Sequence, residues 1–77
     1  MTTYHVNAKH LLCPMPVIKL QEQIASAQVG DVVELMCTDA GSLHDVPAWC
    51  RVHQHTVLSM DTQDSLMVFR IQVNADF

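Results

Sequence analysis

Apolar residues recur along the chain with two different periods, and each period indicates one type of element. After position 14, Val17, Leu20 and Ile24 follow the three- and four-residue spacing of an amphipathic helix. Prolines at the start of this stretch suit the first turn of a helix, and Gly30 is a stop signal beyond its end. The pattern predicts a helix over residues 14–28.

A second helical stretch follows residue 41, and a proline complicates it. Ser42 and Asp45 have the spacing of a capping box, which opens helices. Pro47 lacks a backbone N–H, so inside a helix it would remove a hydrogen bond and produce a kink. We therefore expect a short first turn followed by a main helix over residues 46–53.

Four further stretches are rich in β-branched and apolar residues and are predicted to be strands. They cover residues 4–6, 32–37, 55–60 and 66–73. The first two strands should pair in parallel through a right-handed crossover, and the last two should form an antiparallel hairpin. The predicted fold is an α/β two-layer β-α-β-α-β-β sandwich, in which two helices pack on one face of a four-stranded mixed sheet.

The size and charge of the chain limit what it can do. Its 77 residues are expected to form one domain over residues 1–77, and 49% apolar residues suit a small core. The net charge is −4 and the four basic residues are scattered, which argues against direct nucleic-acid binding. No apolar run reaches membrane-spanning length and residues 1–5 lack a signal-peptide core, so we expect a soluble, cytoplasmic protein with no membrane partner.

Three cysteines, Cys13, Cys37 and Cys50, occur without any C-x-x-C pair. An odd number of cysteines favours reduced thiols over a disulfide framework, and the spacing disfavours a zinc ribbon. Cys50 shares a helical stripe with Leu43 and Val46, which favours a core cysteine over a second relay thiol. Cys37 ends an apolar strand and is interpreted in the same way.

Cys13 stands directly before Pro14, Met15 and Pro16, at the predicted start of the first helix. If Cys13 is the N-cap, the prolines remove two orphan donors and the N–H of Met15 could reach the sulfur. Alternatively the helix begins at Pro16, and Cys13 lies on an extended lead-in. In both cases we expect an exposed sulfur near the positive end of the helix dipole, with its pKa lowered from roughly 8.5 into the range of about 3.5–7.5. The plainer interpretation is a buried small residue that precedes a helix.

Three parts of the chain match the sequence pattern of a known family. They are Val6-Asn7-Ala8 with Leu11 and Cys13-Pro14-Met15-Pro16; Cys37-Thr38-Asp39 with His44-Asp45-Val46-Pro47-Ala48-Trp49-Cys50; and His55. Through these residues the chain resembles the TusA/SirA-like sulfur-carrier family from residue 4 to residue 73. The fold of that family is the two-layer β-α-β-α-β-β sandwich predicted above.

The resemblance implies a sulfurtransferase that carries sulfur as a persulfide on Cys13 and needs no cofactor or metal. A sulfur donor, such as a cysteine desulfurase or a rhodanese, would load Cys13, and an acceptor protein with a reactive cysteine would unload it. Thiol exchange chemistry suits such a relay, because the same thiol must attack once and leave once. Relatives serve tRNA thiolation, sulfur oxidation and cofactor synthesis, so the pathway stays open.

Three residues depart from the family pattern beside the cysteine. The family usually has aspartate at Asn7, glycine at His10, and a basic or polar residue at Leu12. His10 could supply a pH-sensitive positive charge near Cys13, although a solvated loop histidine is the plainer interpretation. Cys50 is the other candidate accessory residue.

Two other classes of function compete with the carrier. An exposed thiol of low pKa would also suit a redox-sensing or regulatory interaction module. A metal-binding domain is a weaker alternative: His53 and His55 would share a face of a strand, but no third ligand has a useful spacing.

Overall fold

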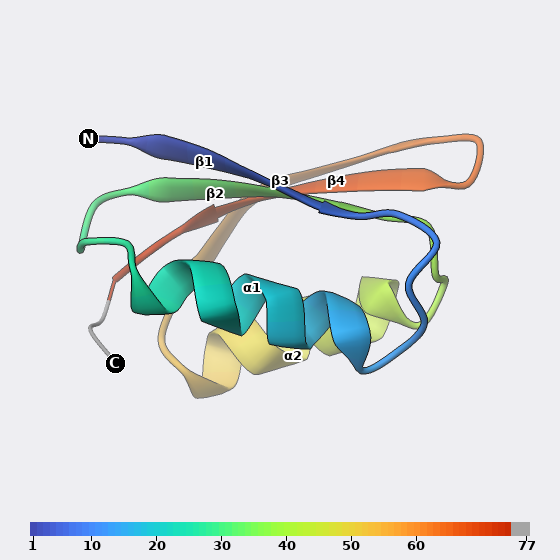
Figure 1. The fold of residues 1–77 in the computed structure, drawn as a ribbon, viewed down its shortest axis with the longest axis horizontal. Helices are drawn as coiled ribbons and strands as arrows, with labels where there is room; N and C mark the ends of the chain where they lie inside the picture. The colour runs from blue at the N-terminus through green and yellow to red at the C-terminus, as the bar shows by residue number, and fades with distance from the viewer. Residues whose placement is uncertain (75–77) are drawn as a thin grey trace.

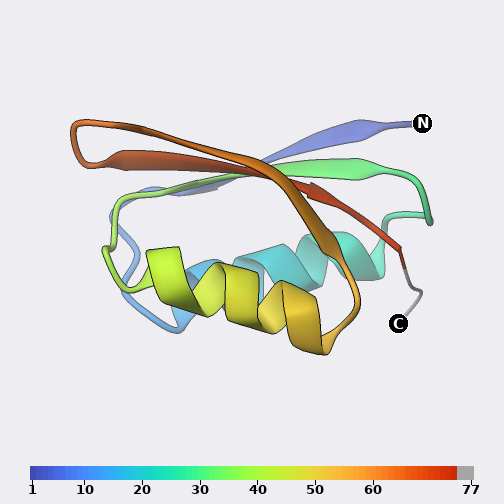
Figure 2. The same cartoon turned by 180° about the vertical axis from the view of Figure 1, so that it is seen from behind.

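The computed structural model describes residues 1–74 as six elements in the order β-α-β-α-β-β (Figure 1). The strands are β1 (Thr3–Ala8), β2 (Val32–Cys37), β3 (Thr56–Gln63) and β4 (Leu66–Gln72). The helices are α1 (Met15–Ala25) and α2 (Ser42–Val52). Both helices cover the same face of the sheet and leave the other face open, as the two opposite views show (Figures 1 and 2). The predicted fold class and order of elements are confirmed.

The sheet has the strand order β1-β2-β4-β3. β1 pairs in parallel with β2, with Val6 opposite Leu35 and Ala8 opposite Cys37. β4 pairs antiparallel with β2 on one side and with β3 on the other, which confirms the predicted hairpin. Because β1 and β2 run in the same direction, both strands end at the same edge of the sheet, and the chain leaves each of them there.

α1 ends at Ala25. The sequence pattern predicted an end at residue 28, so the predicted end is wrong. The Asp31 carboxylate explains the early end, because it accepts the backbone N–H of Gln28 at 3.0 Å and that of Thr2 at 2.9 Å. This contact turns the chain away from the helix and ties it to the start of β1. Gly30 follows with φ 98, a conformation that glycine adopts without steric strain.

α2 is one continuous helix with Pro47 inside it, so the predicted short turn and separate main helix are wrong. The capping box is also wrong, because the N-cap is Gly41 and no side chain caps the helix. A proline at this depth costs about 3 kcal/mol, but burial of Val46 and Cys50 against the sheet opposes that cost. The carbonyl that Pro47 cannot bond belongs to Leu43, a residue that is 46% exposed.

The core lies between the inner face of the sheet and the two helices. Its fully buried side chains come from both layers: Leu20 and Ile24 on α1, Val46 and Cys50 on α2, and Val33, Leu35, Phe69 and Ile71 on the sheet. Aliphatic residues dominate this core, so its stability depends on close packing of a few side chains.

We expect Leu20→Ala to lower the free energy of unfolding by about 2–5 kcal/mol, because it leaves a cavity where a fully buried side chain was. Ile18→Ala on the same helix is the matched control: Ile18 is 39% exposed, and alanine favours the helix. Urea unfolding followed by circular dichroism measures both. Equal losses for the two variants would contradict the described packing of α1.

Candidate functional site

Two loops meet at the edge where β1 and β2 end, and Cys13 lies on one of them. The segment between β1 and α1 carries Cys13, and the segment between β2 and α2 lies beside it (Figure 1). The backbone N–H of His10 donates to Thr38 Oγ1 at 2.8 Å, and the backbone N–H of Cys13 donates to Asp39 Oδ2 at 3.0 Å. The second loop therefore fixes the backbone of the first through side-chain acceptors.

The start of α1 is close to the second predicted arrangement, in which Cys13 lies on a lead-in before the helix. The helix begins at Met15 with Pro14 as its N-cap, so Cys13 lies one residue before the cap, on the lead-in. The N–H of Met15 donates to the carbonyl of Leu12 at 2.8 Å, so the predicted contact of this N–H with the sulfur is wrong. Pro14 and Pro16 have no N–H, so the first turn presents few free donors to a nearby anion.

The sulfur of Cys13 contacts a carboxylate from the second helix. Cys13 is exposed, and its Sγ donates a hydrogen bond to Asp45 Oδ2 at 2.6 Å. This bond raises the pKa of the Cys13 thiol above its ordinary value, and slight burial and the negative charges of Asp45 and Asp39 add to the effect. The predicted lowering of this pKa is therefore wrong, because carboxylates and not helix N–H groups surround the sulfur.

Asp39 and Asp45 are the site residues that sequence reasoning missed, because it used Asp45 as part of a capping box and gave Asp39 no role of its own. A Cβ added at Gly41 would lie 3.3 Å from Asp39 Oδ2 and 3.8 Å from Asp45 Oδ2, so both carboxylates approach the same short stretch of backbone. The parallel pairing of β1 with β2 was the signal that could have found them. It places polar residues that follow β2 beside the residues that follow β1.

The atypical residues near Cys13 have identifiable structural roles. His10 has φ 66, in the left-handed region where glycine carries no strain, which matches the glycine that the family usually has there. Asn7 Oδ1 accepts the backbone N–H of Lys9 at 3.0 Å, and an aspartate could accept the same bond. Leu12 is 73% exposed and adds an apolar side chain directly before Cys13. An electrostatic role of His10 stays a prediction.

The other two cysteines lie in the core. Cys37 and Cys50 are 0% and 1% exposed. Burial raises the pKa of both thiols, that of Cys50 to about 11, so both are protonated at neutral pH. A relay role for Cys50 would require the core to open, and it stays a prediction.

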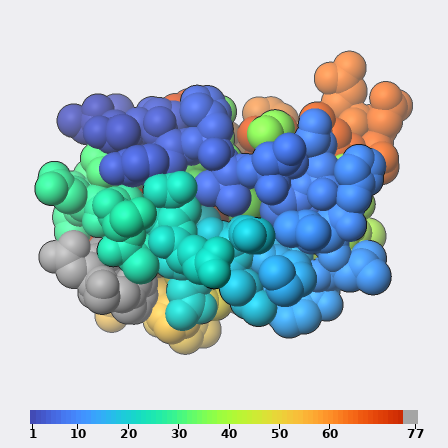
Figure 3. Space-filling view, viewed as in Figure 1, coloured from blue at the N-terminus to red at the C-terminus, as the bar shows by residue number. Residues whose placement is uncertain are grey.

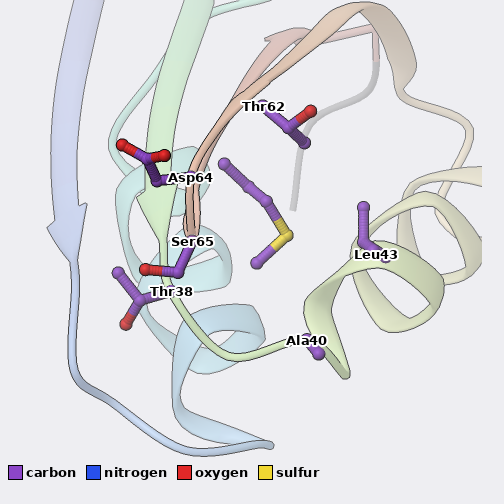
Figure 4. A pocket seen from close by; sticks show the side chains of 7 residues that line it. Thr38, Ala40, Leu43, Thr62, Asp64 and Ser65 are labelled. Carbon is purple, nitrogen blue, oxygen red and sulfur yellow. The ribbon is translucent and has the colours of Figure 1, made fainter.

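A cavity of about 170 Å³ lies next to the site, between the β3–β4 hairpin and the start of α2 (Figure 4). It is lined by Thr38, Ala40, Leu43, Thr62, Asp64, Ser65 and Met67. Thr38 also binds the Cys13 segment, so cavity and site share one loop. Cys13 itself does not line the cavity, and the space-filling view shows the β1–α1 segment on the surface (Figure 3).

The histidine pair considered for metal binding lies elsewhere. The rings of His53 and His55 both pack on Trp49, with centroid separations of 4.5 Å and 5.6 Å. Within residues 1–74, no three histidine, cysteine or acidic side chains are grouped closely enough to hold a metal ion. Neither described helix is long and apolar enough to span a bilayer.

We expect Asp39→Ala to speed hydrogen exchange at the backbone N–H of Cys13 several-fold, because the acceptor of that N–H is lost. Asp39→Asn keeps a side-chain oxygen at the same place and should exchange more slowly than Asp39→Ala. Amide exchange followed by NMR measures both. If the N–H of Cys13 exchanges as slowly in Asp39→Ala as in the unmodified protein, Asp39 does not fix the Cys13 loop as described.

We expect excess iodoacetamide to modify one cysteine of the folded protein and three after unfolding, because Cys37 and Cys50 are buried and Cys13 is exposed. Peptide mass spectrometry identifies the modified residue, and Cys13→Ser is the control that should leave the folded protein unmodified. Modification of Cys50 in the folded protein as fast as that of Cys13 would contradict this assignment.

Comparison with known proteins agrees with the geometry. A sequence profile of the sulfurtransferase TusA family matches residues 4–73. A sulfur carrier protein of Neisseria meningitidis, so described by name, is 31% identical over 72 residues, covering 94% of this chain and 97% of that protein. The similarly described YrkF of Bacillus subtilis is 32% identical over 65 residues, and the match covers 84% of this chain but only 35% of YrkF.

Two further relatives support the family and the fold. The sulfur carrier protein TusA of Buchnera aphidicola is 25% identical over 67 residues, covering 87% of this chain and 85% of that protein. The crystal structure of a SirA-like protein from Desulfitobacterium hafniense has the same fold, with a TM-score of 0.78 at 18% identity, and covers 97% of this chain and 100% of that chain. Because the family profile spans most of the chain and a relative of matching length is 31% identical, the chain belongs to the TusA sulfurtransferase family.

Proposed function

We propose that this protein carries sulfane sulfur as a persulfide on Cys13 and relays it between two partner proteins. One observation carries the proposal: in a chain of the TusA family, Cys13 is the exposed cysteine, and two loops fix its position at one edge of the sheet. Cys37 and Cys50 are buried in the core, so Cys13 provides the only thiol that a docking protein can reach.

The chemistry is two successive thiol exchanges. In loading, the Cys13 sulfur attacks the outer sulfur of a donor persulfide, a new S–S bond forms, and the donor thiolate leaves and takes up a proton. In unloading, the acceptor thiolate attacks the outer sulfur of the Cys13 persulfide, and Cys13 leaves as a thiol. Each step breaks one S–S bond and forms another, so no external oxidant or reductant is required.

The surroundings of Cys13 suit docking of a protein better than binding of a small substrate. The sulfur is exposed and does not line the adjacent cavity. Leu12 and Met15, on either side of the Cys13–Pro14 pair, are 73% and 37% exposed, and they offer apolar contacts to a docking surface. As donor we propose a cysteine desulfurase or a rhodanese, and as acceptor a protein with a reactive cysteine. The cytoplasmic pathway served would be tRNA thiolation, sulfur oxidation or cofactor synthesis.

The competing redox-sensing function receives less support from the site. A peroxide sensor needs a thiol with a low pKa, because the thiolate is the form that is oxidised. The hydrogen bond to Asp45 raises the pKa of Cys13, which keeps the free protein less reactive towards peroxide.

We expect the protein to gain roughly 32 Da, or a multiple of it, after incubation with a persulfide donor, because each sulfur added to the thiol has that mass. Intact mass spectrometry measures the gain, and dithiothreitol should reverse it. Cys13→Ser should gain nothing, whereas Cys50→Ser should gain as much as the unmodified protein. Equal gain by Cys13→Ser would show that Cys13 does not carry the sulfur.

A further inference from the structure

The hydrogen bond between Cys13 and Asp45 links the segment before α1 to the helix α2. Cys13 lies on the lead-in to α1, whereas Asp45 lies in the first turn of α2, 32 residues further along the chain. The Sγ–Oδ2 separation is 2.6 Å, and Asp39 holds the backbone N–H of the same cysteine at 3.0 Å. Two carboxylates thus fix one residue, one at its backbone and the other at its sulfur.

This side-chain bond exists only while the sulfur carries a proton. A carboxylate is solely an acceptor, so the thiol must donate. If Cys13 loses the proton, two negative groups face each other. If Cys13 takes up a second sulfur, Sγ is bonded to carbon and sulfur and has no hydrogen to donate. The outer sulfur of the persulfide then lies about 2.05 Å beyond Sγ.

We propose that Asp45 is a load-sensitive positioning residue: it holds the proton and the position of the Cys13 sulfur in the empty carrier and releases the sulfur once it is loaded. This inference rests on the proposed function, because it assigns a role in the same transfer. The empty carrier is kept as a thiol, which reacts more slowly than a thiolate with small electrophiles. The loaded carrier has lost the bond from Sγ to α2, so Asp45 no longer holds the Cys13 Sγ in place.

The proton follows a balanced path in the loading step. As the Cys13 sulfur bonds to the outer sulfur of the donor persulfide, its proton passes to the Asp45 carboxylate. The S–S bond of the donor breaks, and the departing donor thiolate then takes that proton from Asp45. The carboxylate ends as it began, and no proton or electron is gained or lost by the pair of proteins.

The charged groups near the sulfur are few. Asp45 on α2 and Asp39 on the β2–α2 loop are the charges that act on the Cys13 thiol. The first turn of α1 has no acidic residue. The remaining titratable groups of these elements are Lys9 and His10 in the Cys13 segment, Lys19 and Glu22 on α1, and His44, Cys50 and Arg51 on α2. Only Asp45 bonds the sulfur among the described residues, so its removal is the direct test.

The first experiment measures the rate of alkylation of Cys13 by iodoacetamide as a function of pH. We expect Asp45→Asn to move the midpoint of this profile to lower pH and to speed alkylation at neutral pH several-fold, because the charge that holds the proton is gone. The reagent is neutral, so Asp45 does not attract or repel it. Asp61→Asn, which removes an equal charge from the exposed strand β3, is the matched control and should leave the profile unchanged.

Asp45→Glu is the second variant, because it keeps a carboxylate on α2 and should return the midpoint towards that of the unmodified protein. Circular dichroism establishes that each variant is folded, and a structural role of Asp45 alone would not move the midpoint. If Asp45→Asn and Asp61→Asn give the same profile as the unmodified protein, the proposal is wrong.

The second experiment tests release on loading through a thermodynamic cycle. Methyl methanethiosulfonate converts Cys13 to a methyl disulfide, which imitates the loaded state because Sγ has no proton. We expect this modification to lower the unfolding midpoint in urea more in the unmodified protein than in Asp45→Ala, since only the former has a bond to lose. Equal losses would overturn the proposal. Neither experiment involves a persulfide, so both stand apart from the sulfur-loading assay.

Discussion

The parallel pairing of β1 with β2 is the constraint on which the site depends. It brings the residues after Ala8 and the residues after Cys37 to the same edge of the sheet. There Thr38 and Asp39 bind the backbone of the segment that carries Cys13. A hairpin between these strands would have placed the two loops at opposite ends of the sheet, and the same residues would then have no contact.

Local electrostatics set the protonation state of the Cys13 sulfur, and they oppose the effect of the α1 dipole on its pKa. The prolines beside Cys13 lack N–H groups, and the N–H of Met15 bonds the carbonyl of Leu12, so α1 offers the sulfur little positive potential. Asp45 is in direct contact with it. A hydrogen bond to a carboxylate at short range outweighs a partial charge a turn away, and the pKa of Cys13 therefore rises.

This arrangement is compatible with a carrier that has to survive between two partners. A thiol held in its protonated form exchanges slowly, which protects an exposed sulfur from unspecific disulfide formation. The contact stabilises the folded state fully at pH values below the ordinary thiol pKa, and this stabilisation is lost as the pH rises through the raised pKa of the folded state. Because the site lies on loops at one edge, changes there leave the packed core largely intact.

The sequence is enough to predict the order of elements, the hairpin and the two-layer fold, because hydrophobic period and turn residues act over a few neighbours along the chain. It placed Cys13 near a helix start for the same reason. It failed at Pro47, where burial of α2 against the sheet opposes the cost of a missing backbone bond. The partners of Cys13 could not be predicted in this way, since its contacts with Asp39 and Asp45 join residues 26 and 32 positions apart. Such contacts depend on how strands pair and helices pack, and no local pattern specifies them.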